Sequence, residues 1–374
     1  MRRRLGPAAL FCFLLACGGD DEASIDPVFE SAGPFAVGNT TVSITDSSRV
    51  RTLTVEIWYP QVGAESQGQA VEEFLSGENK ASYEALLTAA PNDCPSIKTQ
   101  SDRDATPTVA TPLPLLVFSH CHNCVRFSSF AIAERLASHG FVVAAPDHTG
   151  NTLFDDLASE GADLNSEFLQ VRAADISFVI DSMLAGQANL VVDPDKIGVY
   201  GHSFGAVTTG LVLQEDPRPI AGFAIASPME NPLLTGVELE KIVDPVGFLV
   251  AVEDNSITEF GNIFIRQNFD DVTAPAWKGE VSDAGHWSFS DICGVHSQFE
   301  ACCGTGTRQT DGQPFTYLPV EQGIAVAQAY VTAFFMAHIQ GDANAKRYLG
   351  ENRFPDILDI QEHGAEPGTS SRLH

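Results

Sequence analysis

One short stretch of the chain carries residue types that can do chemistry at a defined spacing. Gly201-His202-Ser203-Phe204-Gly205 is a Gly-x-Ser-x-Gly pattern that follows an apolar strand pattern at 197–200 and precedes a small-residue helix pattern. In such a turn the serine projects from the sheet, and crowding excludes a side chain two residues away on either side. The following helix directs its first N–H groups at the serine, where negative charge develops during acyl transfer. The pattern predicts that Ser203 is a nucleophile.

A nucleophilic serine needs a base and a carboxylate, and both follow later strand patterns. Serine reacts once an imidazole accepts its proton, and a carboxylate orients that imidazole. In an open parallel sheet such groups gather at the carboxyl ends of the strands. We therefore expect His286 to be the general base and Asp254 the acid, with Glu253 as the second choice and Asp147 as a weaker alternative. For Asp254 and Glu253 the other interpretation is a charge or cap at the start of a helix over 257–265.

The loop after the first parallel strand pattern, residues 119–124, is expected to supply an oxyanion donor. The two predicted donors are the backbone N–H groups of His122, in this loop, and of Phe204. The loop holds two histidines and two cysteines, so a metal site is an alternative. Adjacent ligands on so short a loop make poor tetrahedral geometry, and we expect Cys121 or Cys124 to form a disulfide instead. No metal and no cofactor are expected.

Hydrophobic periodicity indicates the elements that position these residues. Apolar runs of the kind buried in a parallel sheet alternate with segments of helical spacing. The expected strands cover residues 113–118, 141–145, 197–200, 221–226, 246–252 and 277–281, and the expected helices cover about 130–137, 166–184 and 320–339. Strands alternating with helices imply right-handed crossovers and a mostly parallel central sheet with helices on both faces. The predicted fold class is α/β, and the order of nucleophile, acid and histidine predicts the α/β-hydrolase fold.

The rest of the chain divides around this core. Residues 41–45 and 51–59 alternate like an antiparallel strand pair. Residues 61–111 form a polar insertion with two short helical patterns, which we interpret as a surface excursion, with a lid over the site as the alternative. The catalytic domain is expected over 34–340, and residues 341–374 are expected to form a C-terminal segment with a disordered end.

The N-terminus carries a targeting pattern. Arg2-Arg3-Arg4 precedes a short apolar run that ends in Leu14-Leu15-Ala16-Cys17, which resembles the lipobox of bacterial lipoproteins. The resemblance implies a signal peptide over 1–16, lipidation of Cys17 and a polar tether over 17–33. The apolar run is too short to span a membrane, and an ordinary secretory signal is the alternative. The expected location is the bacterial cell envelope, lipid-anchored in the periplasm or on the cell surface, or otherwise outside the cell.

Cysteine usage fits an exported protein. Of eight cysteines, Cys12 lies in the signal and Cys17 is the anchor; the remaining six are Cys94, Cys121, Cys124, Cys293, Cys302 and Cys303. An even number in an oxidising compartment predicts up to three disulfides. Cys293 paired with Cys302 or Cys303 would close a short loop and is favoured; the other pairings stay open.

Composition limits the partners. The 374 residues are 44% hydrophobic, enough for one large domain with a substantial core. The net charge is −28, and no basic cluster occurs beyond the first residues, so nucleic acid is not expected as a partner. We expect a monomer that meets the membrane only through its lipid anchor.

Four motifs in order carry a family resemblance. They are Ile57-Trp58-Tyr59-Pro60, Phe118-Ser119-His120, Gly201-His202-Ser203-Phe204-Gly205 and His286-Trp287-Ser288-Phe289-Ser290-Asp291. Together they resemble the bacterial α/β-hydrolases grouped with platelet-activating-factor acetylhydrolases, and they are similar to bacterial polyester hydrolases and cutinases. The resemblance covers roughly 34–339 without the insertion. It implies the nucleophile and base roles for Ser203 and His286, oxyanion roles for the backbone at His122 and Phe204, and a place in lipid degradation.

The chain departs from these families at three positions. Cys121 stands where a glycine usually follows the oxyanion-loop histidine. The acetylhydrolases place their acid after the strand that follows the elbow, where this chain has Ser227. The polyester hydrolases place it one strand later, in a register that falls on Asn255, so the carboxylate would have moved to Asp254.

These observations predict a serine hydrolase that cleaves carboxylic esters through an acyl-enzyme. A thioesterase or peptidase with the same triad is the alternative within the class. A non-catalytic surface binding protein on a hydrolase scaffold is the alternative outside it. The ester substrate's acyl and alcohol groups are left open.

Overall fold

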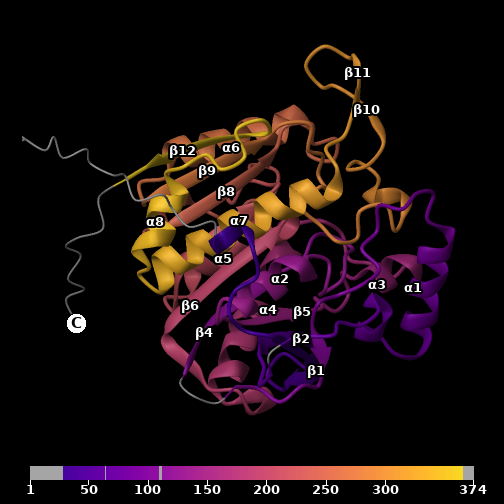
Figure 1. Ribbon diagram of the computed structural model, residues 1–374, viewed down its shortest axis with the longest axis vertical. Coiled ribbons are helices and arrows are strands. Elements are labelled where there is room, and N and C mark those ends of the chain that lie inside the picture. Colours follow the sequence, from indigo (N-terminus) through magenta and orange to yellow (C-terminus); the bar gives the residue numbers. More distant parts are fainter. Residues whose placement is uncertain (1–27, 64, 109–111, 365–374) are drawn as a thin grey trace, which may run out of the picture.

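The computed structural model describes residues 28–63, 65–108 and 112–364, and its centre is one large sheet (Figure 1). Within these residues ten strands pair in the order β12-β9-β8-β7-β6-β4-β5-β2-β1-β3. Six consecutive members of this order are mutually parallel: β4 (Leu113–Ser119), β5 (Val142–Pro146), β6 (Val192–His202), β7 (Pro219–Ile225), β8 (Val246–Ala251) and β9 (Ala276–Val281). The prediction of a mostly parallel sheet is confirmed.

Shorter or antiparallel strands complete the two edges. β1 (Val37–Asp46) and β2 (Arg51–Pro60) form the expected antiparallel pair, and β2 joins the parallel strands by pairing with β5. The two-residue β3 (Asp102–Arg103), which comes from the insertion, pairs with β1. At the other edge β12 (Leu358–His363) runs antiparallel to β9. The sequence of β12 lacks a continuous apolar run, which is why periodicity gave no strand in the C-terminal segment.

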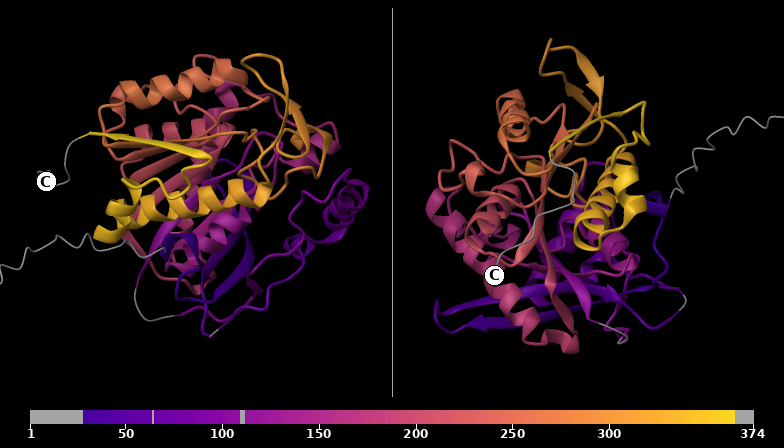
Figure 2. Two further views of the ribbon diagram at one scale, coloured as in Figure 1. Left: turned by 45° about the horizontal axis from the view of Figure 1, so that its top comes forward. Right: turned by 90° about the vertical axis from the view of Figure 1, so that its left-hand side faces the viewer.

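Helices cover both faces of the sheet, as predicted (Figure 2). One face packs against α2 (Phe130–Ser138), α7 (Val320–Ile339) and α8 (Ala343–Leu349), and the other against α4 (Ser166–Leu184), α5 (Phe204–Glu215) and α6 (Thr258–Asp271). Strand β4 shows how the faces are divided: Leu116 and Phe118 enter the first core, while Leu115 and Val117 enter the second. This alternation follows from the two-residue period of a strand, so a run that is apolar throughout must be covered on both sides.

The insertion is polar in composition, yet it packs against the core. Its two helical patterns correspond to a 3₁₀ turn at Val71–Phe74 and to α1 (Gly77–Ala89). Val71, Phe74 and Tyr83 are fully or almost fully buried. The ring of Phe74 stacks on Phe127 of the core at a centroid distance of 5.1 Å.

Three disulfides join the six cysteines of the described residues: Cys94–Cys303, Cys121–Cys124 and Cys293–Cys302. The last is one of the two pairings that the short loop favoured, and Cys121–Cys124 accounts for the two cysteines of the predicted oxyanion loop. Cys94–Cys303 links the insertion to the segment after β9. The expected signal peptide and Cys17 lie outside the described residues. Within those residues, no helix is both long and apolar enough to cross a membrane.

Candidate active site

Ser203 occupies a strained turn between β6 and α5. Its φ of 56° and ψ of −120° lie in a region that a non-glycine residue adopts only when its surroundings enforce it. The Ser203 N–H donates to the Ile225 carbonyl at 2.9 Å, which holds the turn against β7. A Cβ on Gly201 would lie 2.1 Å from the carbonyl oxygen of Gly205, and a Cβ on Gly205 would lie 1.8 Å from that of Ser119. Both glycines are therefore required by close backbone approach.

Asp254 and His286 lie together at the carboxyl ends of β8 and β9. Nδ1–H of His286 donates to Oδ2 of Asp254 at 2.6 Å, and both side chains are almost completely buried. The other carboxylate oxygen, Oδ1, accepts the backbone N–H groups of Ser256 and Ile257, each at 2.9 Å. The same carboxylate therefore closes the turn before α6 and contacts the imidazole, whereas the N-cap of α6 is Ile257, which has no side-chain cap.

Glu253, the second candidate for the acid, forms hydrogen bonds with different partners. Its Oε1 accepts from Arg308 and its Oε2 accepts the backbone N–H of Gln309, both at 2.9 Å. These partners belong to residues 304–317, which contain the small hairpin of β10 (Thr305–Thr307) and β11 (Pro314–Thr316). The Glu253 carboxylate thus makes no hydrogen bond to the predicted base.

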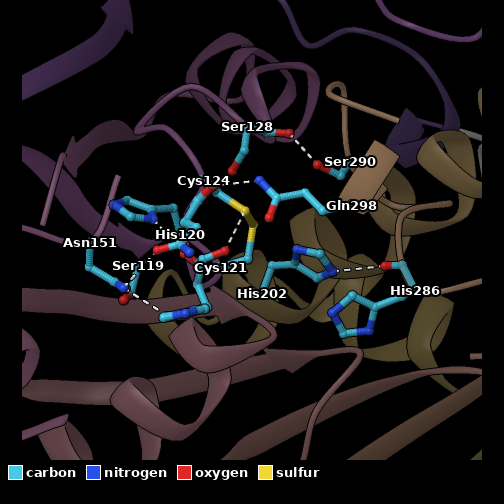
Figure 3. The surroundings of a disulfide bond; sticks show 12 residues. Ser119, His120, Cys121, Cys124, Ser128, Asn151, His202, His286, Ser290 and Gln298 are labelled. Carbon is cyan, nitrogen blue, oxygen red and sulfur yellow. Dashed lines mark hydrogen bonds between the residues drawn. A yellow bond between two sulfur atoms is a disulfide. The ribbon is translucent and has the colours of Figure 1, made fainter. Parts of the chain in front are cut away.

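The loop that carries His286 is joined to the turn that carries Ser203 through the side chain of His202. Nε2–H of His202 donates to the main-chain carbonyl of His286 at 2.8 Å, and the two rings are 4.9 Å apart (Figure 3). Burial, and then the neighbouring His286, hold the pKa of His202 well below its usual value, so this ring is neutral. Nδ1 of His202 has no hydrogen-bond partner within the described residues. The side chain of His202 thus packs against His286.

Ser203 Oγ and His286 Nε2 make no hydrogen bond in the described part of the chain. The elbow and the histidine loop are nevertheless adjacent through the His202 contact, and Nδ1 of His286 is occupied by Asp254, so Nε2 is the nitrogen left for a proton. Nucleophile–base hydrogen bonds often become short only in a substrate complex.

The two predicted oxyanion donors are unpaired among the described residues. Phe204 is the first residue of α5, where an N–H has no intrahelical acceptor. Its side chain is buried under the guanidinium of Arg172, which lies 4.5 Å from the ring centre. His122 lies in the turn after β4, and neither its backbone N–H nor that of Phe204 finds an acceptor in the described ranges.

A buried polar network that sequence reasoning missed lies beneath the oxyanion loop. Oγ of Ser119 and Nε2 of His148 are 3.0 Å apart, and Nδ1 of His148 is 3.0 Å from Oδ2 of Asp175. This is a second Ser-His-Asp arrangement, but its side chains have almost no exposed surface and no substrate could reach them. Burial, followed by the charge of Arg172, lowers the pKa of His148 to about 3, so this histidine is neutral and structural.

Arg172 of α4 is the centre of this network. It is fully buried, and its guanidinium donates to Oγ of Ser119, to Oδ1 of Asn151 and to the carbonyl of His120. The signal in the sequence is its helical position: Arg172 falls four residues after Phe168 and four before Ile176, on the apolar side of α4. An arginine at such a position must be paired inside the fold.

The metal interpretation of the oxyanion loop does not fit its cysteines. Both sulfur atoms are used in the Cys121–Cys124 disulfide, and a disulfide sulfur is not a thiolate ligand. In the described residues, no group of three or more His, Cys, Asp or Glu side chains could hold a metal ion.

Comparisons with known proteins agree with this fold. Residues 24–156 match the family model for platelet-activating factor acetylhydrolase, isoform II, and residues 112–246 match the model for serine aminopeptidase, S33. The platelet-activating factor acetylhydrolase of Canis lupus familiaris is 31% identical over 152 residues, which cover 30% of this chain and 34% of that protein. The enzyme of Bos taurus is 30% identical over a stretch of the same length and coverage. The chain thus spans about a third of the length of the curated relatives that it matches.

A solved structure extends the likeness of the fold to most of the chain. A ferulic acid esterase from Streptomyces cinnamoneus superposes with a TM-score of 0.63 and 24% sequence identity, over 82% of this chain and 91% of that chain. At this identity the match establishes the α/β-hydrolase fold. The sequence matches add a likeness to platelet-activating factor acetylhydrolases over about a third of the chain.

Proposed function

We propose that this protein is a serine-dependent carboxylic ester hydrolase. The observation that carries the proposal is the buried His286–Asp254 hydrogen bond, adjacent to a serine in the strained conformation of a nucleophile elbow. In the proposed reaction Ser203 Oγ attacks the ester carbonyl while Nε2 of His286 accepts its proton, and Asp254 stabilises the imidazolium through Nδ1. The N–H groups of His122 and Phe204 bind the oxyanion. The His286 imidazolium then gives this proton to the departing alkoxide, and loss of the alcohol leaves an acyl-enzyme. Water hydrolyses the acyl-enzyme with His286 again as the base.

The likeness to platelet-activating factor acetylhydrolases supports an ester as the substrate, and the match to the serine aminopeptidase model supports a peptidase as the second candidate. The same triad and oxyanion donors could serve either reaction, so substrate tests must include both.

The decisive assay is hydrolysis of p-nitrophenyl esters, from acetyl to palmitoyl, by the full chain and by Ser203→Ala, with aminoacyl p-nitroanilides alongside. We expect ester turnover in the wild type and a loss of about 10⁴-fold or more in the variant, because the nucleophile is absent. The chain-length profile would then define the acyl preference. Equal rates in the two proteins would refute the serine mechanism, and turnover of anilides alone would favour the peptidase.

We further propose that the enzyme is exported and held by a lipid on Cys17. The three disulfides support an oxidising compartment. The same ester assay on cell fractions tests the anchor: Cys17→Ser should move the activity out of the membrane fraction. Activity that stays with the membrane in this variant would contradict the proposal.

A further inference from the structure

The oxyanion loop contains a disulfide at the point where the chain departs from the families it resembles. Cys121 replaces the usual glycine, and it is bonded to Cys124 across a separation of three residues. Both cysteines are completely buried. Figure 3 shows their disulfide and its surroundings. We propose that this disulfide is a positioning element for catalysis, which fixes the backbone N–H of His122 in its oxyanion role. The inference rests on the proposed ester hydrolysis.

The ring closed by the disulfide contains the donor itself. His122 and Asn123 are the two residues between the bonded cysteines, so the cross-link directly limits the backbone angles on either side of the His122 N–H. Asn123 has a φ of 53°, in the left-handed region that asparagine tolerates better than most residues. A cross-link across so few residues removes little entropy from the unfolded chain, so its main effect is on local geometry.

Hydrogen bonds occupy the loop around the donor. The carbonyl of His120 accepts from Arg172, and that of Cys121 is 2.7 Å from Nδ1 of the His120 ring. The carbonyl of Cys124 accepts the N–H of Leu153 at 2.7 Å. Within the described residues the N–H of His122 is without an acceptor, although the carbonyl groups before and after it in the loop accept hydrogen bonds. A fixed donor without a partner is what oxyanion stabilisation requires, because no reorganisation is then needed as charge develops.

The side chain of His122 is held separately. Nδ2–H of Asn151 donates to its Nδ1 at 2.8 Å, and Oδ1 of Asn151 accepts from Arg172 at 2.6 Å. Burial, and then the charge of Arg172, lower the pKa of His122, so the ring is neutral with Nδ1 as acceptor. Asn151 thus restrains the ring while the disulfide restrains the backbone, and loss of the disulfide should affect the donor without releasing the side chain.

The test compares Cys121→Ser/Cys124→Ser with Cys94→Ser/Cys303→Ser, which removes a disulfide that fastens the insertion. Each full-length protein is assayed for kcat and KM on a p-nitrophenyl ester, for inhibition by phenylboronic acid and for thermal unfolding. We expect the first variant to lose about 100-fold in kcat, the effect of removing one oxyanion donor, with KM changed less than about threefold. Its affinity for the boronic acid should fall in parallel, because the tetrahedral adduct uses the same donor. The control should unfold at a lower temperature and keep its kcat.

A second variant, Cys121→Gly/Cys124→Ser, restores the glycine of the related families and should recover part of the lost kcat. Wild-type kcat in Cys121→Ser/Cys124→Ser would overturn the inference, and so would a rise in KM alone. If both variants at these positions fail to fold while the control folds, the disulfide holds the fold and the inference is likewise overturned. Failure of the proposed function is distinguishable, because Ser203→Ala would then be as active as the wild type.

Discussion

At the scale of single residues, two adjacent carboxylates have been given separate partners. Asp254 contacts the imidazole of His286, whereas Glu253 is bound by Arg308 and Gln309 on the hairpin side. Both residues lie in the turn that follows β8, and this turn directs the two side chains to different partners. The sequence named both residues but could not determine which side each one faces.

Substitution of each carboxylate tests which of the two acts in catalysis. Asp254→Asn should lower kcat by about 10³-fold or more with the fold intact, because an amide neither holds the correct His286 tautomer nor stabilises the imidazolium. Glu253→Gln is the matched control and should cost only a few-fold. Steady-state kinetics on a p-nitrophenyl ester, with circular dichroism to verify folding, measures both. A larger loss of kcat in Glu253→Gln than in Asp254→Asn would identify Glu253 as the acid.

At the scale of elements, the β10–β11 hairpin fastens the loops that carry the proposed acid and the proposed base. Arg308 bridges Glu253, beside the acid, and Asp283, three residues before His286. Gln309 donates through Nε2 to the carbonyl of Asp254 at 2.7 Å and accepts the N–H of Glu259 at 2.6 Å. The hairpin projects beyond the sheet in Figure 1 and is joined to it through these contacts.

The two hairpin side chains should differ in importance. The side chains of Arg308 and Asp283 are 35% and 39% exposed, and the backbone N–H of Gln309 still donates to the buried Glu253 when Arg308 is lost. Arg308→Ala should therefore reduce kcat less than about fivefold. Gln309→Ala removes two hydrogen bonds at the acid loop and should reduce kcat by about 5- to 30-fold. Gln313→Ala, at an exposed glutamine of the same hairpin, is the control and should leave kcat unchanged. A loss in Arg308→Ala as large as that in Gln309→Ala would contradict this ranking.

At the scale of the whole molecule, two buried carboxyl groups attach the insertion to α2. Glu134 accepts the backbone N–H of Gln100 and the hydroxyl of Ser101, while Asp291 accepts the hydroxyl of Ser96 and the N–H of Ala131. Both carboxyls line a cavity of about 920 Å³ between the N-terminal segment, the insertion, α2 and α7. With the Cys94–Cys303 disulfide, they hold residues 94–101 against the core.

Burial gives these carboxyls a pH-dependent effect on stability. It raises the pKa of Glu134 to about 8 and that of Asp291 to about 7, opposed in both cases by the hydrogen bonds they accept. A carboxyl with a raised pKa in the folded state stabilises the fold below its unfolded pKa and loses that contribution as the pH rises through the folded value.

The melting temperature should therefore fall by about 5–10 °C between pH 5 and pH 8.5. Glu134→Gln/Asp291→Asn should flatten this dependence, because neither amide titrates. Glu321→Gln, which removes an exposed carboxyl from the same cavity, should leave the slope as in the wild type. Scanning calorimetry across this pH range gives the comparison. An unchanged slope in the double variant would show that other groups are responsible.

The sequence by itself determined what depends on local pattern. Periodicity predicted the parallel strands and the helices that cover them. The glycine spacing predicted the elbow, and the order of the loops named Ser203, Asp254, Glu253 and His286 as the candidates. A short loop also favoured pairing Cys293 with Cys302 or Cys303, and the structure has the first of these. These features depend on residues that are close in the chain or on which strand end they follow.

Only the tertiary structure decided what depends on contacts between distant segments. Asp254, and not Glu253, is the carboxylate that binds His286. Cys94 is bonded to Cys303, 209 residues away. Arg172 is buried under the oxyanion loop. The tertiary structure also added β12 as an edge strand. The direction of a side chain at the end of a strand, and the partner of a buried charge, depend on which strands become neighbours in the sheet, and that order is not encoded in any short stretch of the chain.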